Sequence, residues 1–233
     1  MKRQFDPGKL ELMDRPQPVS AELEQDLHRI RQINRYFGSY RLVLEFVRRW
    51  IKTGDNVRIV DLATGSGDIP RLIVDFARTI GARVQIDALD RQSPTLEIAS
   101  KLSVEYPEIS FIESDMLTWQ PSDRYDLVLC TLVLHHFSEQ DAVRVLQQCR
   151  KFSRNLVLVS DLCRGWLATS GAYLLTALIF REPMTKHDAR LSVARAFSFQ
   201  EVHSLAQRAG WTSFGHKKFR FGRQAIWMPK TND

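Results

Sequence analysis

Short apolar runs alternate with amphipathic helical stretches along the chain from Val57 onward. An uninterrupted run of about four to eight aliphatic and β-branched residues is typical of a strand buried on both faces, whereas apolar residues at every third or fourth position indicate a helix. Strands separated by helices form parallel sheets with right-handed crossovers. The pattern therefore predicts an α/β domain with a doubly wound sheet. Its expected strands are 57–62, 84–89, 109–112, 127–130 and 156–160, and its expected helices are 69–79, 95–106 and 139–152.

The region before this alternation is predicted to be helical. Apolar residues recur at helical spacing after Ser20, so a helix is expected to begin at Ala21 with Ser20 as its N-cap. A second amphipathic helix leads to Gly54. Residues 1–19 are polar and broken by prolines, and they are expected to form a loose arm. The chain thus divides into an arm with lid helices, 1–54, and the α/β domain, 55–233.

The alternation pauses after the fifth expected strand. Residues 162–196 form a longer, partly apolar insertion, which is expected either to complete the core or to roof a pocket. A final helix is predicted from Ser198, as N-cap, to 209, with a glycine stop behind it. Two strand-like pieces follow, 213–219 and 224–227. They lie close enough in sequence to form an antiparallel hairpin at the sheet edge.

Length and charge restrict the partners of the protein. The 233 residues fit one α/β domain with a modest insertion, and the net charge is +6 with a pI near 9.4. The basic residues are spread over several stretches, without the dense stripe or the stacking aromatics of a nucleic-acid-binding module. We therefore expect no nucleic-acid partner, although an acidic substrate stays possible.

The three cysteines and the N-terminus indicate the compartment. An odd number of cysteines without CxxC or Cys/His spacing predicts neither a disulfide framework nor a zinc site, so no metal is expected. The first residues lack the apolar core of a signal peptide. The longest apolar run, 172–180, is far shorter than the roughly 20 residues of a transmembrane helix. We expect a cytoplasmic protein, either a monomer or a homodimer.

The strongest local signal follows the first expected strand. Asp61 ends the apolar run, and the small residues Ala63, Thr64, Gly65 and Gly67 form a turn that leads into a helix. Glycines allow the backbone to turn sharply and to approach a ligand closely, which then lies against the helix N-terminus. A turn of this kind also occurs in α/β proteins as a purely structural element.

Further signals follow the later strands. Asp90 ends the second strand, where a carboxylate can accept hydrogen bonds from both ribose hydroxyls of an adenosine ligand. Asp115 follows the third strand and can accept the exocyclic amine of adenine, with Met116 packed on the ring. The fourth strand runs into a loop that carries His135 and His136. All four signals stand at the carboxyl ends of successive strands, and this shared placement favours a common site.

Together, these motifs resemble those of the class I S-adenosylmethionine-dependent methyltransferases, over roughly residues 57–227. Ala63 stands where the first motif of that family usually has a glycine. The resemblance implies a Rossmann-like seven-stranded sheet, mostly parallel with an antiparallel last strand, and S-adenosylmethionine as the cofactor. The residues that it assigns to cofactor binding are Asp61, Ala63, Thr64, Gly65, Gly67, Asp90, Arg91, Asp115, Met116 and Thr131.

Two related classes fit less well. A nicotinamide-binding Rossmann enzyme normally carries G-x-G-x-x-G, whereas Gly67 is followed by Asp-Ile-Pro. A nucleic-acid base methyltransferase would carry Asn/Asp-Pro-Pro-Tyr/Phe after the fourth strand, where this chain has Cys-Thr-Leu-Val at 130–133. The Leu-His-His-Phe sequence at 134–137 instead resembles small-molecule members, such as quinone-biosynthesis and polyketide O-methyltransferases.

Candidate catalytic residues are histidines, because methyl transfer needs alignment of the acceptor and at most a nearby base. His135, His136 and His187 are the candidates, and Asp188 beside the last of these could alternatively cap a helix. The candidate substrate-binding residues are Arg41, Tyr173 and Arg195.

The predicted function is methyl transfer from S-adenosylmethionine to oxygen, or less often carbon, of a small aromatic or lipid-like metabolite. Two alternatives stay open. The basic charge suggests a nucleic-acid methyltransferase, and the fold could also serve as a cofactor-binding scaffold without turnover.

Overall fold

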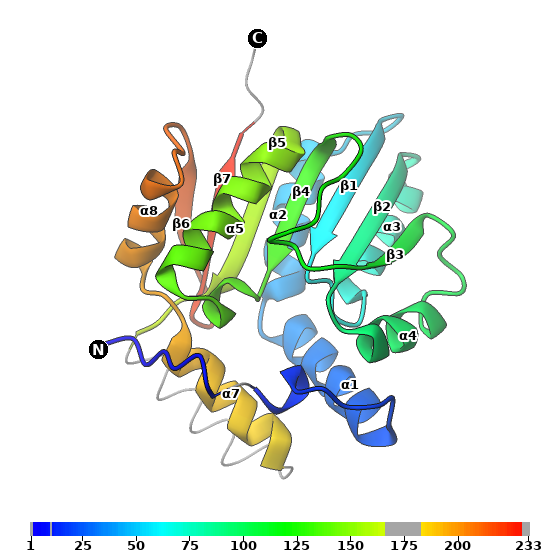
Figure 1. Ribbon diagram of the computed structural model, residues 1–233. Coiled ribbons are helices and arrows are strands. Elements are labelled where there is room, and N and C mark those ends of the chain that lie inside the picture. Colours follow the sequence, from blue (N-terminus) through cyan, green and yellow to red (C-terminus); the bar gives the residue numbers. More distant parts are fainter. Residues whose placement is uncertain (1, 10, 166–182, 230–233) are drawn as a thin grey trace.

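A seven-stranded sheet lies between layers of helices in the computed structural model, which describes residues 2–9, 11–165 and 183–229 (Figure 1). The strand order is β3-β2-β1-β4-β5-β7-β6. The strands are β1 (Asn56–Leu62), β2 (Arg83–Asp90), β3 (Ile109–Glu113), β4 (Tyr125–Thr131), β5 (Ser153–Leu162), β6 (Gly215–Phe219) and β7 (Arg223–Met228). The helices are α1 (Ala21–Tyr36), α2 (Ser39–Trp50), α3 (Asp68–Ile80), α4 (Ser93–Lys101), α5 (Glu139–Phe152), α7 (Pro183–Arg195) and α8 (Phe199–Arg208), with the 3-10 turns η1 (Leu12–Asp14) and η2 (Leu134–His136).

The strand directions confirm the predicted fold class. Strands β1 to β5 pair in parallel, β7 pairs antiparallel with β5, and β6 pairs antiparallel with β7. Strand β1 has β2 on one side and β4 on the other. From β1 the chain proceeds through β2 and β3 toward one edge of the sheet, and after β3 it returns to the other side of β1, where β4 lies. In open α/β sheets a ligand crevice forms at this switch point, outside the carboxyl ends of the strands.

Alternating side chains of the central strands fill two cores, one on each face of the sheet. On one face, Val60 and Leu62 of β1 pack with residues of α5 and α8. On the other face, Ile59 packs with residues of α2 and α3. Burial of both faces explains why the parallel strands have apolar residues at successive positions instead of alternating apolar and polar ones.

Serine side chains cap the starts of α1 and α8. Ser20 accepts the backbone N–H of Leu23, which confirms the predicted start of α1. Ser198 begins α8 in a reciprocal capping box with Glu201, and its side chain also confirms a predicted cap. Asp188 does not begin a helix, because it lies inside α7, so its predicted capping role is wrong.

The N-terminal arm is not loose, contrary to the expectation from its prolines. Figure 1 shows it beside α1 and α7, at the end of the sheet toward which the parallel strands point. The Arg3 guanidinium donates to the carbonyl oxygens of His135, Phe137 and Arg195, at 3.1, 2.7 and 2.5 Å. The Gln4 N–H donates to the Ala194 carbonyl. Because these contacts join residues more than 130 positions apart, no local pattern could reveal them.

Two predicted element bounds also need correction. The helix expected over 95–106 ends at Lys101, and β5 extends beyond the expected 156–160 at both ends, to Ser153 and Leu162. The added residues of β5 bring Asp161 to the carboxyl edge of the sheet, beside η2.

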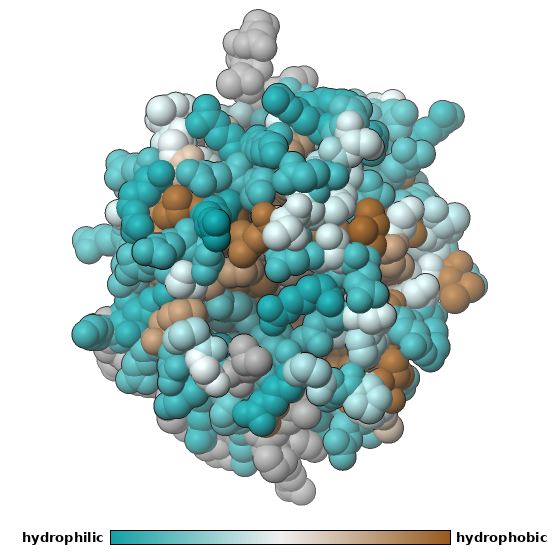
Figure 2. Space-filling model, viewed as in Figure 1, coloured by the Kyte–Doolittle hydropathy of each residue, from teal (hydrophilic) through white to brown (hydrophobic). Residues whose placement is uncertain are grey.

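Among the described residues, no helix is long and apolar enough to cross a membrane. The face seen in Figure 2 is mainly hydrophilic, with small hydrophobic patches separated by polar side chains.

The hairpin that closes the sheet depends on Gly215. A Cβ atom at this position would lie 2.1 Å from two ring carbons of Trp227, whose ring packs against Phe46 of α2. We therefore expect Gly215→Ala to lower the free energy of unfolding by about 3 kcal/mol, as overpacking of a core does. Urea denaturation checks this, with Gly165→Ala as the control, since a Cβ at Gly165 would meet nothing within 4 Å. Equal midpoints for the two variants would contradict the packing argument.

Candidate active site

A cavity of about 750 Å³ lies at the switch point of the sheet. Its walls come from the loops after β1, β2, β3 and β4, from the N-terminal arm, from α1 and α7, and from the β6–β7 turn. The volume is within the range of small-molecule sites, about 300–1,000 Å³. Most of the residues predicted for the site line this cavity: Ala63, Thr64, Gly65, Asp90, Arg91, Asp115, Met116, Thr131, His135, His136 and Arg195.

The turn after β1 is held by hydrogen bonds to its neighbours. The Thr64 N–H donates to the Leu89 carbonyl (2.8 Å), and the Gly65 N–H donates to the Asp90 carboxylate (2.9 Å). Ala63 has φ +58°, in the left-handed region that favours glycine. This backbone conformation explains why glycine is the usual residue of the first motif at that position. A Cβ at Gly65 would meet nothing within 4 Å, so the turn faces open space where a ligand could lie.

Two predicted cofactor residues do not line the cavity. Asp61 is completely buried beneath the turn, where its Oδ2 accepts the Thr64 hydroxyl at 2.8 Å. Gly67 precedes α3 at φ +70°, and a Cβ there would lie 3.1 Å from the Phe111 ring. Both residues therefore shape the turn, and neither contacts the cavity directly.

The residues after β2 and β3 offer acceptor oxygens to the cavity. Asp90 accepts the backbone N–H groups of Gly65 and Gln92, one on each carboxylate oxygen. Burial raises the pKa of Asp90, and these two hydrogen bonds oppose the rise. Asp115 is exposed and accepts the Leu117 N–H through Oδ1, while the neighbouring Met116 is buried and lines the cavity.

Burial raises the pKa of Asp61 to about 7, despite its hydrogen bond from Thr64. The unfolded chain releases this proton near pH 4 while the folded protein keeps it, so stability from Asp61 is lost as the pH rises toward 7. We expect the free energy of unfolding of the wild type to fall by up to about 1.4 kcal/mol per pH unit, relative to Asp61→Asn, between pH 5 and 7. Urea titrations of both proteins at several pH values measure this difference. Parallel pH dependences would contradict the raised pKa.

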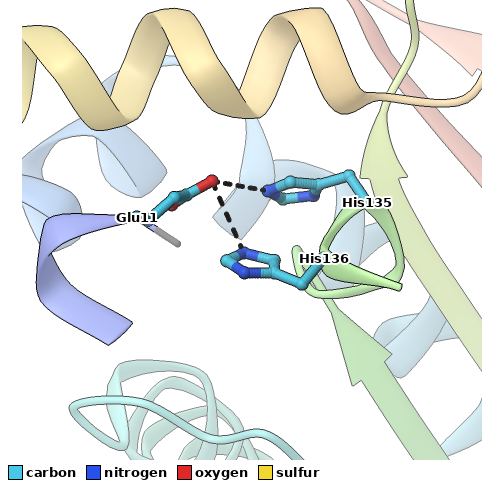
Figure 3. Close-up of side chains that lie close together, drawn as sticks. All are labelled: Glu11, His135 and His136. Atoms are coloured by element: carbon cyan, nitrogen blue, oxygen red, sulfur yellow. Dashed lines mark ion pairs between the residues drawn. The ribbon is translucent and has the colours of Figure 1, made fainter. Parts of the chain in front are cut away.

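Two histidine–carboxylate pairs lie at η2, the turn that follows β4. His135 is buried, and its Nδ1 lies 2.7 Å from Oδ1 of Asp161, whose Oδ2 accepts the His135 backbone N–H. His136 Nδ1 lies 2.7 Å from Oδ2 of Asp14, in η1 of the arm. Figure 3 shows both imidazoles directed toward Glu11, which, like Asp14, comes from the arm. The two Nε2 atoms lie 3.7 and 3.8 Å from Oε1 of Glu11.

The carboxylates around these histidines determine their charge. Burial alone would lower the pKa of His136, but Glu11 and Asp14 outweigh it and raise that pKa to about 9. Burial would likewise raise the pKa values of Asp14 and Asp161, but the adjacent histidines lower both. Each histidine is thus paired with an ionised carboxylate at neutral pH.

Three predicted site residues lie elsewhere. Arg41 is exposed on α2 and does not line the cavity. His187 on α7 has a half-exposed side chain and does not line the cavity, although its partner Asp188 does. Tyr173 falls outside the described residues. The structure therefore brings His135 and His136 together with Arg195, but it does not place Arg41 or His187 at the cavity.

The residues that sequence reasoning missed are mostly acids of the arm and of α3. Glu11, Asp14 and Asp68 line the cavity, and Asp161 orients His135 through its hydrogen bond with Nδ1 of that ring. Asp68 also accepts hydrogen bonds from Asn34 of α1 (3.1 Å) and from the Tyr40 hydroxyl of α2 (2.9 Å). These two hydrogen bonds connect α1 and α2 to the start of α3. Only the position of Asp68, directly after the glycine turn, carried a signal in the sequence.

Comparisons with known proteins agree with this architecture. Residues 59–155 match the family model described as "Methyltransferase domain". The chain is also 30% identical over 81 residues to the 2-phytyl-1,4-naphtoquinone methyltransferase of Thermosynechococcus vestitus, a match that spans 35% of each chain. The matched segment thus covers about a third of that curated relative.

Two solved structures share the fold at low identity. Human N-acetylserotonin methyltransferase, in complex with S-adenosylmethionine, has a TM-score of 0.62 and 17% identity, over 89% of this chain and 55% of that one. The magnesium protoporphyrin IX methyltransferase of Synechocystis, with bound S-adenosylhomocysteine, has a TM-score of 0.58 and 14% identity, over 94% and 91% of the two chains. The resemblance to class I S-adenosylmethionine-dependent methyltransferases is confirmed. Residues 59–155 thus match a methyltransferase domain, and the chain has the fold of that class.

Proposed function

We propose that this protein transfers a methyl group from S-adenosylmethionine to an oxygen atom of a small aromatic or lipid-like metabolite, with carbon as the second choice of acceptor atom. The observation that carries the proposal is the convergence of Gly65, Asp90 and Asp115 on one cavity with His135 and His136. Strand-end acids of this kind suit an adenosine, and the histidines suit a hydroxyl that must lose its proton.

The cofactor half of the cavity fits an adenosine ligand on three counts. The open space at Gly65 leaves room for a ligand against the turn. An ionised carboxylate has about four lone-pair positions, and backbone N–H groups use two of those of Asp90, which leaves acceptor capacity for ribose hydroxyls. Met116 offers an apolar surface beside Asp115 for the adenine ring. When bound, S-adenosylmethionine supplies a methyl group on a positive sulfur, and transfer breaks that carbon–sulfur bond, with the electron pair returning to sulfur.

The acceptor half is formed mainly by apolar side chains of the arm, α1, α7 and the β6–β7 turn. This composition supports an aromatic or lipid-like acceptor over a strongly charged one. Apolar or aromatic residues that line it include Phe5, Leu27, Ile30, Ile33, Phe37, Val193 and Phe221. Arg195 and Arg223 are cations of this wall and would donate hydrogen bonds to a polar substituent of the acceptor.

Activation of the acceptor is assigned to His135. The Nδ1 atom of each imidazole carries a proton, because its carboxylate partner only accepts hydrogen bonds at neutral pH. An uncharged His135 ring therefore presents its Nε2 lone pair toward the cavity, whereas His136, whose pKa is raised to about 9, is a cation at neutral pH and acts as a donor. An acceptor hydroxyl held there would lose its proton to Nε2 of His135 as the oxygen forms its bond to the methyl carbon. His187, which lies outside the cavity wall, takes no part in the proposed reaction.

The test is transfer of isotope-labelled methyl from S-adenosylmethionine to a panel of phenols, quinols, hydroxylated lipids and RNA. Labelled ethers of the small acceptors are the expected products. Labelled RNA with salt-dependent binding would instead identify a nucleic-acid enzyme. Cofactor binding without transfer to any member of the panel would favour a scaffold, and products with a new carbon–methyl bond would correct the acceptor atom.

A further inference from the structure

Three potential metal ligands converge between the arm and η2. Glu11 is contributed by the arm, and His135 and His136 by η2, and Figure 3 shows their side chains pointing toward one another from these two segments. Each residue offers one ligand atom, and the three atoms lie within 4.8 Å of one another. Glu11 and His135 are buried and His136 is mostly so. Because the cysteines have no zinc spacing and Glu11 is over 120 positions from the histidines, no local sequence pattern predicts such a group.

The distances within this group do not fit hydrogen bonds. The Nε2 atoms of His135 and His136 lie 3.7 and 3.8 Å from the same oxygen of Glu11, beyond the range of about 2.7–3.2 Å for an N–H···O bond. Two ligands of one ion, each bound at about 2.1 Å, would lie 3.7–3.8 Å apart at an angle of about 125°, somewhat wider than tetrahedral. The spacing therefore suits atoms that share an ion better than atoms that share a proton.

The hydrogen bonds behind the two imidazoles fit the same interpretation. Metal-binding histidines almost always donate their other ring N–H to a carboxylate or carbonyl, which fixes the tautomer and directs the lone pair at the metal. Here Asp161 holds Nδ1 of His135 and Asp14 holds Nδ1 of His136, each at 2.7 Å. Both rings thus present Nε2 to one point. The Ser192 hydroxyl donates to Oε1 of Glu11 at 2.7 Å, the same oxygen that faces both Nε2 atoms, and so holds the third ligand in place.

We propose that Glu11, His135 and His136 bind one divalent transition-metal ion of the zinc type inside the acceptor half of the cavity. Two imidazoles and one carboxylate suit zinc, iron or cobalt, whereas magnesium and calcium prefer oxygen ligands alone. The carboxylates of Glu11, Asp14 and Asp161 supply the negative charge that a buried dication requires. Three protein ligands leave coordination positions open toward the cavity, as in catalytic sites.

This site deepens the proposed function, on which its role depends. A hydroxyl of the acceptor would coordinate the ion at an open position, which lowers the pKa of that hydroxyl. Because the bound ion would occupy the Nε2 lone pairs, the histidines would act as ligands in place of a base. The proton of the coordinated hydroxyl would then pass to water, and the oxygen left behind would carry the electron pair that forms the bond to the methyl carbon. The ion would also fix the acceptor oxygen in place, so that only molecules with a suitably placed hydroxyl would react.

The experiment is a titration of the chelator-treated full-length protein with Co²⁺, without any cofactor, followed by visible absorption. We expect one equivalent of Co²⁺ to give the bands of a site with few ligands, and one equivalent of Zn²⁺ to abolish them. Glu11→Gln and His136→Ala should weaken Co²⁺ binding by about 100-fold or more, and Asp14→Asn by about 10- to 100-fold. The control is His187→Ala, which removes an imidazole outside the cavity and should bind like the wild type.

Circular dichroism on each variant confirms that it is folded. Should Glu11→Gln fail to fold, Asp14→Asn tests the same site without removing a ligand. Absence of Co²⁺ bands in the wild type overturns the proposal, and so does binding that is equal in His136→Ala and His187→Ala. Because the readout needs neither S-adenosylmethionine nor turnover, a failure of the metal site and a failure of the methyltransferase proposal are seen separately.

Discussion

Replacement of Asp90 by alanine is expected to weaken S-adenosylmethionine binding by about 100-fold. Hydrogen bonds to a charged acceptor contribute about 1.5–3 kcal/mol each, and the ribose offers two hydroxyls to this carboxylate. A loss of about 3 kcal/mol corresponds to a factor of about 100 in the dissociation constant. The Gly65 and Gln92 N–H groups would lose their acceptor as well, which loosens the turn. Isothermal calorimetry measures the effect.

The matched control for this variant is Asp75→Ala. Asp75 is an exposed carboxylate of α3 that accepts a hydrogen bond from the Tyr106 hydroxyl, and neither residue lines the cavity. Its removal should leave cofactor affinity unchanged within about twofold. Thermal melts of both variants separate a loss of affinity from a loss of folding. If Asp90→Ala bound S-adenosylmethionine as tightly as Asp75→Ala does, the ribose assignment would be wrong.

The second large effect concerns turnover. His135→Ala should lower the rate of methyl transfer by about 10²- to 10⁴-fold, the range for loss of a general base, while cofactor affinity stays within about twofold of the wild type. The reason is that His135 stands on the acceptor half of the cavity, whereas Asp90 and the β1 turn form the cofactor half. Single-turnover kinetics at saturating S-adenosylmethionine measure the chemical step directly.

Two companion variants sharpen this experiment. His187→Ala removes a histidine that does not line the cavity, and this variant should retain the wild-type rate. Asp161→Asn keeps His135 but removes the charge that orients it, so we expect a smaller loss of rate together with a shifted pH–rate profile. Equal rates for His135→Ala and His187→Ala would exclude His135 from the reaction.

The sheet could be predicted from the sequence because its determinants are local. Every expected parallel strand overlaps an observed one, since burial on both faces requires a continuous apolar run. The serine caps at Ser20 and Ser198 were likewise visible, because a cap depends on residues within one turn. The end of α4 could not be predicted, because Leu102 and the turn residues that follow it continue the apolar pattern although the helix has ended.

The cofactor half of the site was predictable for a related reason. Strand order brings the carboxyl ends of β1, β2 and β3 together, so Gly65, Asp90 and Asp115 converge once the sheet is known. The exceptions were positional. Asp61 stands one step away from the cavity, because side chains at the end of a strand alternate between the ligand and the core. Gly67 stands away from it because it is the N-cap of α3 and faces the Phe111 ring.

The acceptor half could not be predicted, because its polar residues meet through tertiary contacts alone. Glu11 and Asp14 belong to a segment whose prolines and polar residues indicate a loop, and nothing near them in sequence indicates a partner. Arg41 and His187 are candidate site residues because of their residue type and their position in or near expected lid segments. Their helices present them to solvent instead.

Arg3 pins the first residues of the chain to the carbonyl groups of the η2 loop and of α7, and Glu11 and Asp14 follow on the same strap. Proteolytic removal of the first 19 residues should therefore strip the cavity of two carboxylates, while the strand-end loops with Gly65, Asp90 and Asp115 keep their anchorage in the sheet. In the proposed reaction, exchange of this strap would alter one wall of the acceptor half, and α1, α7 and the β6–β7 turn would keep the others.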